Sequence, residues 1–339
     1  MKNIIRKNKT FLTIYGICIA VGLLLPHTIA STFAMNTIIL SLIWSIMGIG
    51  WNFIGGYAGQ VSNGHALYYA IGAYTVAVGA DKFGASPWMT MWIGIAISAG
   101  LAFILGKPLL RLNGAYFLIA TMAVAECARI IFLNVSYVGA ATGIMFLDKK
   151  HSSWYSLQFK DKEPFYYILL VIVALLVLFA KRLDKSKFGY YLRAIKANEM
   201  SAQSAGINTP RYKVRAYMLS AAIVSLAGSL YAPFVQYVDP YTLLPLDKST
   251  MICLVAVMGG IGTVAGPILG AFVMTFISEY ARAAFSGSSG LNMLVYGIVV
   301  IFIVLFMPGG LISIGQKARD RFRKARKRKE GGGENGFDS

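Results

Sequence analysis

The sequence predicts an all-α, polytopic membrane protein with about ten transmembrane helices. Of its 339 residues, 57% are hydrophobic and only 14% are charged, whereas soluble domains carry roughly 25% charged residues. The apolar residues form runs about as long as the roughly 20 residues that cross a bilayer. Lysine and arginine gather between these runs, as they do on the cytoplasmic side of membrane proteins.

The apolar runs set the expected crossings. They lie at residues 11–30, 35–54, 66–80, 88–106, 114–133, 165–181, 216–236, 248–259, 267–284 and 290–308. The first could be a cleaved signal peptide, but the many later spans favour an uncleaved first span. Because 66–80 and 248–259 are short, eight crossings with two re-entrant segments is the alternative. Residues 1–310 then form a transmembrane domain, and 311–339 a basic, disordered cytoplasmic tail.

The formal net charge of +18 is distributed as a membrane protein distributes it, not as a nucleic-acid-binding protein does. Nine Lys or Arg lie within 181–215, and nine more within 317–329. By the positive-inside rule, we expect both termini and the 182–215 loop to be cytoplasmic. The chain is then expected to be a multi-pass protein of the cell membrane. The basic tail orients the chain and is attracted to anionic lipid. No nucleic-acid partner is expected.

Two glycine-rich segments interrupt the apolar runs: the first break, residues 55–65 (GGYAGQVSNGH), and the second break, residues 259–267 (GGIGTVAGP). Broken helices at membrane depth often carry substrate or gates in transporters. The alternative is a pair of tight turns at the inner surface. Gly262, Gly266 and Gly270 stand four apart, which predicts a close helix–helix contact.

The first break carries a cluster of polar side chains in an apolar setting. Its members are Gln60, Ser62, Asn63 and His65. Polar groups at membrane depth need partners, and a passing solute could supply them. Exposed backbone N–H groups at the start of the following helix could meet an anion. The alternative is that these residues pair with one another and brace the turn.

Glu126 and Arg129 lie three apart within the span at 114–133, so they share a helix face and can pair. Ionisable residues within a span are candidates for a solute pathway, and a structural ion pair is the alternative. Glu279 and Arg282 repeat this spacing near a span end, where long side chains reach water easily. We therefore regard them as weaker candidates.

The cytoplasmic loop predicts a short helix from Glu199 to Ala205. Asn198 can cap its first turn, Gly206 can end it in a left-handed conformation, and Pro210 prevents its continuation. A preceding stretch places Tyr191, Leu192 and Ile195 at helical spacing. Two short helices would make a docking element for a partner protein; an amphipathic loop lying on lipid is the alternative.

No residue set in the sequence predicts catalysis or a metal site. Gly106-Lys107-Pro108 lacks the upstream phosphate cradle and the Ser or Thr of a P-loop. The three histidines are far apart, and the three cysteines lack metal-ligand spacing. The chain is therefore not expected to be an enzyme or to bind a cofactor. Any energy for uphill transport must come from another subunit.

Three motifs together resemble the branched-chain amino acid permease family of ABC importers, in the membrane subunit known as LivM. The loop motif is carried by Gly189, Leu192-Arg193-Ala194-Ile195, Glu199, Ala202, Gly206-Ile207 and Tyr212-Lys213. The early motif is residues 56–65, and the late motif is residues 259–267. The resemblance spans roughly residues 35–310. Asn63 departs from it, because the family usually has an apolar residue there.

The resemblance implies a transport subunit that forms half of a translocation pathway. Its implied partners are a similar second permease subunit (LivH-like), two ATPase subunits that use ATP, and an extracytoplasmic binding protein. Asn198, Glu199, Ala202, Ala205 and Gly206 would then form the helix that couples to the ATPase. Within residues 136–144 (SYVGAATGI), Thr142 and Gly143 would belong to an outer gate, to the surface that receives the binding protein, or to an ordinary loop. Urea, amides or sugars are alternative solutes, and a self-contained channel or carrier is the alternative mechanism.

Overall fold

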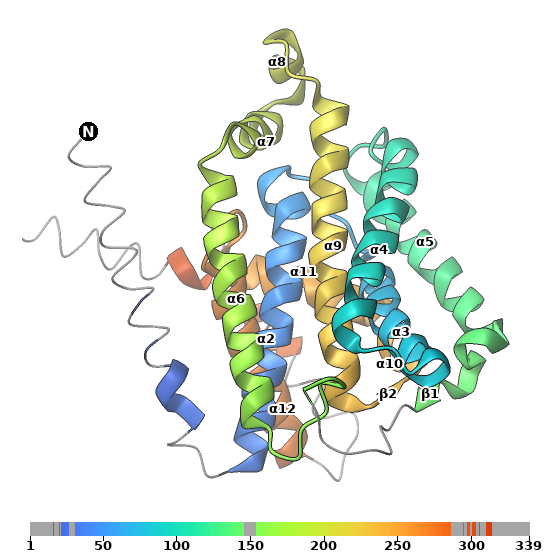
Figure 1. Ribbon diagram of the computed structural model, residues 1–339. Coiled ribbons are helices and arrows are strands. Elements are labelled where there is room, and N and C mark those ends of the chain that lie inside the picture. The colour runs from blue at the N-terminus through green and yellow to red at the C-terminus, as the bar shows by residue number, and fades with distance from the viewer. Residues whose placement is uncertain are drawn as a thin grey trace, which may run out of the picture.

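A computed structural model describes residues 31–145 and 154–285, with residues 16, 20, 22–26, 294, 297, 298, 300–302, 305 and 310–313. The described chain is a bundle of helices that run up and down past one another (Figure 1). The spans expected at 11–30 and 290–308 and the tail at 311–339 lie wholly or mostly outside the described residues.

The elements follow the expected order. The long helices are α2 (Thr32–Asn52), α3 (His65–Phe83), α4 (Pro87–Leu109), α5 (Ala115–Asn134), α6 (Glu163–Asp184), α9 (Thr209–Val235), α11 (Leu246–Gly260) and α12 (Gly266–Ala284). The short helices are α7 (Lys187–Ala197), α8 (Glu199–Ser204) and α10 (Pro240–Leu243), with the single turns Ser136–Val138 and Ala140–Thr142. Strands β1 (Ile144–Met145) and β2 (Tyr237–Val238) form one antiparallel pair of two residues each. The expected all-α class therefore holds.

The described residues contain six helical segments that are long and apolar enough to cross a membrane. They are Thr32–Tyr57, Pro87–Leu109, Ala115–Asn134, Glu163–Asp184, Thr209–Val235 and Pro240–Gly260. The helices α3 and α12, of 19 residues each, are not among them. The structure thus fits a polytopic helical membrane protein, and the count of about ten crossings is not established.

Two predicted boundaries were wrong for identifiable reasons. α9 begins at Thr209, seven residues before the expected start at 216. Pro210 stands in its first turn, where a proline loses no hydrogen bond. The first break is also partly helical, because α2 continues into a π-helical turn at Phe53–Tyr57. Such turns often accompany functional sites in helices.

The core is formed by α2, α3 and α9. In the most apolar window of each segment, 89% of the residues are buried in Thr32–Tyr57 and 61% in Thr209–Val235, but only 17% in Ala115–Asn134. Close backbone approach holds the core together, since a Cβ at Gly228 would overlap the backbone of α3. The predicted close helix–helix contact is confirmed for Gly266 and Gly270, which pack directly on Gly259 of α11. Gly262 lies between α11 and α12 and faces Gly56 of the first break instead.

The two ends of the bundle differ in character (Figure 1). The short helices α7 and α8 lie together at one end, which we name the α8 end. The β1–β2 pair and α10 lie at the opposite end, which we name the β end. α9 runs between the two ends, because α8 precedes its first residue closely and β2 follows its last.

Candidate functional site

The short helix α8 forms where the loop sequence predicts it, with capping at both ends. The Asn198 side chain accepts a hydrogen bond from the Ser201 N–H at 2.9 Å. At the other end, Gly206 adopts a left-handed φ of 84°. Its N–H donates to the Gln203 carbonyl, and the Ile207 N–H donates to the Ala202 carbonyl. This pair of bonds is a Schellman motif, so α8 is a preformed turn with a fixed end and Ala205 as its last cap residue.

A buried ion pair fixes α8 to the start of α9. Lys213 Nζ lies 2.5 Å from Glu199 Oε2, and the Lys213 side chain is only 1% exposed. The Thr209 hydroxyl donates to the other Glu199 oxygen at 3.1 Å. Glu199 therefore does more than favour the first turn of its own helix. We call this contact the α8 latch, since it makes α8 and the first turns of α9 one rigid unit.

The outer face of α8 is largely exposed. Met200 is 80% exposed, whereas Ala202 faces inward and is 4% exposed. A side chain added at Gly206 would meet no described atom within 4 Å. An open groove of about 1280 Å³ lies beside α8, between the end of α4 and the start of α9. Its basic residues are Lys107, Arg111, Arg211 and Arg215.

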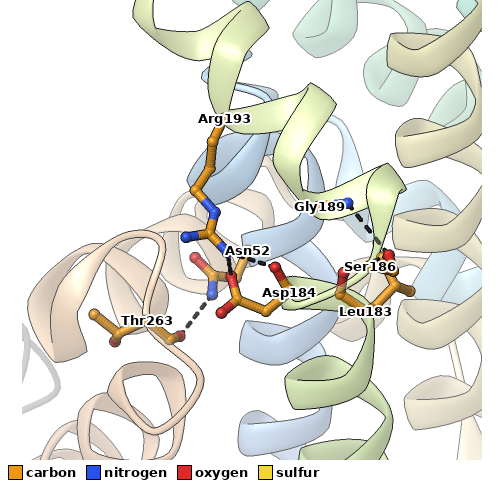
Figure 2. Close-up of polar contacts among 7 residues, drawn as sticks. All are labelled: Asn52, Leu183, Asp184, Ser186, Gly189, Arg193 and Thr263. Atoms are coloured by element: carbon orange, nitrogen blue, oxygen red, sulfur yellow. Dashed lines mark hydrogen bonds and ion pairs between the residues drawn. The ribbon is translucent and has the colours of Figure 1, made fainter. Parts of the chain in front are cut away.

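α7 is folded back against the end of α6 by contacts around a tight turn (Figure 2). Arg193 donates to both the backbone carbonyl and the carboxylate of Asp184, at 2.5 Å each. Ser186 caps α7 by accepting from the Gly189 N–H at 3.4 Å. A Cβ at Gly189 would overlap the α6 carbonyls. The angle between α6 and α7 is therefore fixed by packing and by a partly exposed ion pair.

The two breaks lie against each other and against α7. Asn52, in α2 three residues before the first break, holds the second break, because its amide donates to the Thr263 carbonyl and its oxygen accepts from the Gly262 N–H, both at 2.8 Å. Figure 2 shows the first of these bonds beside the α6–α7 turn. Lys196 of α7 donates to the Gly56 carbonyl at 2.8 Å, and partial burial there lowers the Lys196 pKa. The breaks thus touch the loop that carries α8, and both interpretations of them, as gates and as inner turns, stay predictions.

The polar cluster of the first break is braced by other helices rather than by its own members. The Asn63 N–H donates to the Thr121 hydroxyl at 3.0 Å, and its side chain donates to the Thr250 hydroxyl at 3.0 Å. The Ser249 hydroxyl accepts from the Ala66 N–H at 2.9 Å. At the start of α3, the Ser249 hydroxyl therefore occupies the Ala66 N–H. The suggestion that N–H groups at this helix start meet an anion stays a prediction.

His65 and Ser62 are buried, while Gln60 is half-buried at the edge of the cluster. His65 Nε2 lies 2.7 Å from the Ser220 hydroxyl of α9. The Ser62 carbonyl accepts from the Trp51 indole at 2.8 Å. These contacts support the interpretation of His65 as a structural hydrogen-bonding residue. The assignment of Gln60, Ser62, Asn63 and His65 to a solute pathway stays a prediction.

The other candidates lie elsewhere. Arg129 and Glu126 form the predicted pair, with Arg129 Nε 2.9 Å and 3.0 Å from the two Glu126 oxygens. The pair lies on the lightly buried α5, and its side chains are 28% and 34% exposed. Thr142 and Gly143 lie at the β end, where the Thr142 carbonyl accepts from the Tyr237 hydroxyl at 2.8 Å. The described contacts therefore join neither pair to the polar cluster, and their roles stay predictions.

A further polar site was missed from the sequence. Lys248, near the start of α11, lines a pocket of about 150 Å³ with Glu279 and Arg282 of α12 and with Trp44 of α2. Glu279 and Arg282 were weak candidates on spacing alone. Lys248 could have been found as a lysine within an apolar stretch, but nothing local indicates that it lies beside residues 31 and 34 positions further along the chain.

Sequence comparisons show which known proteins the chain is similar to. The chain is 28% identical over 297 residues to the high-affinity branched-chain amino acid transport system permease protein LivM of Escherichia coli (strain K12), a match covering 81% of this chain and 69% of that protein. It is 22% identical over 333 residues to a probable LivM of Methanocaldococcus jannaschii, covering 82% of this chain and 94% of that protein. It is 28% identical over 273 residues to a probable LivH of the same organism, covering 75% and 83%.

No solved structure matches the chain significantly. The sequence profile of the family described as "Branched-chain amino acid transport system / permease component" matches residues 33–304. This match includes the long helices from α2, apart from its first residue, to α12, together with both breaks and the loop that carries α8. The chain therefore belongs to the branched-chain amino acid transport permease family.

Proposed function

We propose that this chain is the membrane-spanning permease subunit of an ATP-driven importer for branched-chain amino acids. The observation that carries the proposal is α8: a preformed, protruding helix that a buried ion pair fixes to a long helix of the bundle. Family membership supports the solute class, because the similar proteins are named as branched-chain amino acid transport permeases.

In the proposed mechanism, α8 seats in a groove of a separate ATPase subunit, with Met200 as an apolar anchor. Closure of two ATPase subunits on ATP would displace α8, and the α8 latch would pass that displacement to α9. Lys196 would pass it to the two breaks, through its bond to the first of them. The chain itself binds no cofactor in this mechanism, and ATP is used by the partner subunits.

The charge distribution supports a cytoplasmic position for the α8 end. The nine Lys and Arg residues of 181–215 lie in or beside the loop that forms this end, and Lys107 and Arg111 line its groove. Basic residues between spans are retained on the cytoplasmic side. The β end would then face outward and receive an extracytoplasmic binding protein. A LivH-like second permease subunit would complete the pathway.

Substitution of Gly206 tests the coupling role. Gly206→Arg places a long, charged side chain in the open space beside α8. Gly84→Arg is the matched control, since Gly84 also has positive φ and no described neighbour within 4 Å of an added Cβ. Both variants carry the left-handed strain of about 1–2 kcal/mol. Only Gly206 adjoins α8.

We expect both variants to insert in the membrane at normal levels. Gly206→Arg should lose co-purification with the ATPase and uptake of radiolabelled leucine, whereas Gly84→Arg should keep the co-purification. Equal co-purification of Gly206→Arg and the control with the ATPase would contradict docking through α8. Uptake by the purified chain alone in liposomes, without nucleotide, would instead favour a self-contained carrier.

A different solute remains the alternative within importers. A strain lacking this gene should lose depletion of leucine, isoleucine and valine from the medium, and should regain it with the gene restored. If the strain instead lost the ability to deplete urea, an amide or a sugar, that compound would be the solute. The proposed coupling mechanism would remain in place.

A further inference from the structure

The pocket that contains Lys248 is formed mainly by one face from each of three helices, and Tyr69 of α3 and Tyr231 of α9 complete its lining. Its lining includes Leu40, Ile43, Trp44 and Met47 of α2, Lys248, Met251 and Val255 of α11, and Met274, Thr275, Ser278, Glu279 and Arg282 of α12. These residues recur at helical spacings of three and four, so each helix turns one continuous stripe toward the same space.

Polarity changes along the pocket from one end to the other. On α12, the buried Met274 precedes Glu279, which is 16% exposed, and Arg282, which is 65% exposed. On α11 the order is reversed, because Lys248 lies at the helix start and the buried Val255 lies two turns later. All three charged groups therefore lie at one end of the pocket and the apolar side chains at the other.

The volume suits a small aliphatic group. A cavity of 150 Å³ admits a molecule the size of benzene, and this pocket has about 150 Å³ with its charged end included. A branched four-carbon side chain is smaller than benzene, whereas an indole ring is larger. The buried residues Met47, Val255 and Met274 would surround such a group.

The charges at the other end suit both ends of a zwitterion. Among the described residues, Lys248 has no carboxylate within 4 Å, and its ammonium lies 5.5 Å from the centre of the Trp44 ring. Within the part of the chain that the structure describes, Glu279 makes its one ion-pair contact with Arg282, at 3.5 Å. Lys248 is partly buried and forms no such pair there, although the carboxylates of Glu279 and Asp239 act on it from a longer distance. A partly buried ammonium without an ion pair is costly to desolvate, and ionisable groups within spans mark solute paths. A ligand carboxylate would relieve that cost.

We propose that this pocket binds a zwitterionic α-amino acid with a branched aliphatic side chain. Its carboxylate would lie at Lys248 and Arg282, its ammonium at Glu279, and its side chain among the buried apolar residues. The inference rests on the proposed function, since it places the solute of that importer within this chain. It assigns the recognition to α2, α11 and α12 rather than to the polar cluster of the first break.

Three ligands separate the contributions of the charges. Leucine carries both charged groups, 4-methylpentanoate lacks the ammonium, and 3-methylbutylamine lacks the carboxylate. Binding of each is measured on the purified complex of this chain with its partner subunits in nanodiscs, without the binding protein, by ligand-observed NMR titration. The variants are Lys248→Met and Glu279→Gln. Lys82→Met is the matched control, because Lys82 is an exposed lysine at the β end outside the pocket.

We expect Lys248→Met to weaken leucine and 4-methylpentanoate at least tenfold and to leave 3-methylbutylamine unchanged. Glu279→Gln should weaken leucine and 3-methylbutylamine at least tenfold and leave 4-methylpentanoate unchanged. The retained ligand in each case shows that the variant is folded, and Lys82→Met should match the wild type for all three.

If the wild type and both variants bound each ligand with equal affinity, the proposed binding site in this pocket would be overturned. Leucine uptake by the wild-type complex would in that case still uphold the proposed function. A wild-type complex that imports another solute and binds none of the three ligands would overturn both. A third variant, Met274→Trp, fills the apolar end. It should exclude leucine while alanine still binds, and equal loss of both would contradict the placement of the side chain.

Discussion

The α8 latch gives the sharpest test of how this chain would receive force. Lys213 is 1% exposed and its ammonium contacts Glu199 at 2.5 Å, while the Glu199 side chain is 32% exposed. Removing one partner of a buried pair costs about 3–5 kcal/mol, and a hydrogen bond to a charged group contributes about 1.5–3 kcal/mol. Because Glu199 is partly exposed to solvent, we expect Glu199→Gln to destabilise the docked state of α8 by about 2 kcal/mol, near the low end of these ranges.

A loss of about 2 kcal/mol raises the open fraction of α8 roughly 30-fold. Hydrogen–deuterium exchange of the α8 backbone should accelerate by that factor in Glu199→Gln, while exchange in α2 and α3 stays unchanged. The second readout is leucine uptake per ATP hydrolysed by the reconstituted importer, which should fall. Lys213→Met in the same chain removes the buried charge, so the double variant should recover much of the protection.

Arg193→Gln is the matched control, because it removes an ion pair in the same loop whose side chains are 46% and 27% exposed. Exposed pairs contribute about 1 kcal/mol or less, so its effect on α8 exchange should be small. Equal acceleration in Glu199→Gln and Arg193→Gln would refute the reasoning that burial makes the latch strong. So would a double variant no better protected than Glu199→Gln alone.

Three further predictions concern contacts away from the latch. Lys196→Met removes the bond from α7 to the first break, so uptake should fall while co-purification with the ATPase persists; unchanged uptake would exclude this route of coupling. Glu126→Gln should change thermal stability by less than about 1 kcal/mol, since the pair is partly exposed; a changed leucine affinity would favour a pathway role, and folding loss without it a structural ion pair. Gly228→Ala should lower stability by about 1–3 kcal/mol through overpacking against α3, measured by thermal unfolding in detergent. Gly100→Ala, which meets no described atom, should be neutral or stabilising.

Local signals predicted α8 well because every residue that defines it lies within eight positions. Asn198 caps it and Gly206 ends it, and both effects operate over one helical turn. The predicted start of α9 was wrong for a related reason. A proline such as Pro210 is excluded from the interior of a helix but is favoured in a first turn, and the sequence alone does not say which of the two applies.

Contacts between distant segments could not be predicted in the same way. Lys213 reads as one more basic residue of a cytoplasmic loop, yet it is buried because α8 folds back over it. Lys248 meets α12 only through the packing of α11 on that helix. The hydroxyls that brace Asn63 come from α5 and α11. Side-chain periodicity shows which face is buried, but it does not name the partner across the interface.

The length of α9 has a mechanical consequence. Its 27 residues, with Pro233 in the last turns, correspond to about 40 Å, and Gly228 presses it against α3 well away from its midpoint. A helix that pivoted at this contact would act as a lever: the arm from Lys213 to Gly228 is about 22 Å, and the arm from there to Val235 about 10 Å. A sideways displacement of about 4 Å at Lys213 would then become a displacement of about 2 Å in the opposite direction at Val235, next to β2. Tightening on one side of the membrane and loosening on the other would then be a single motion.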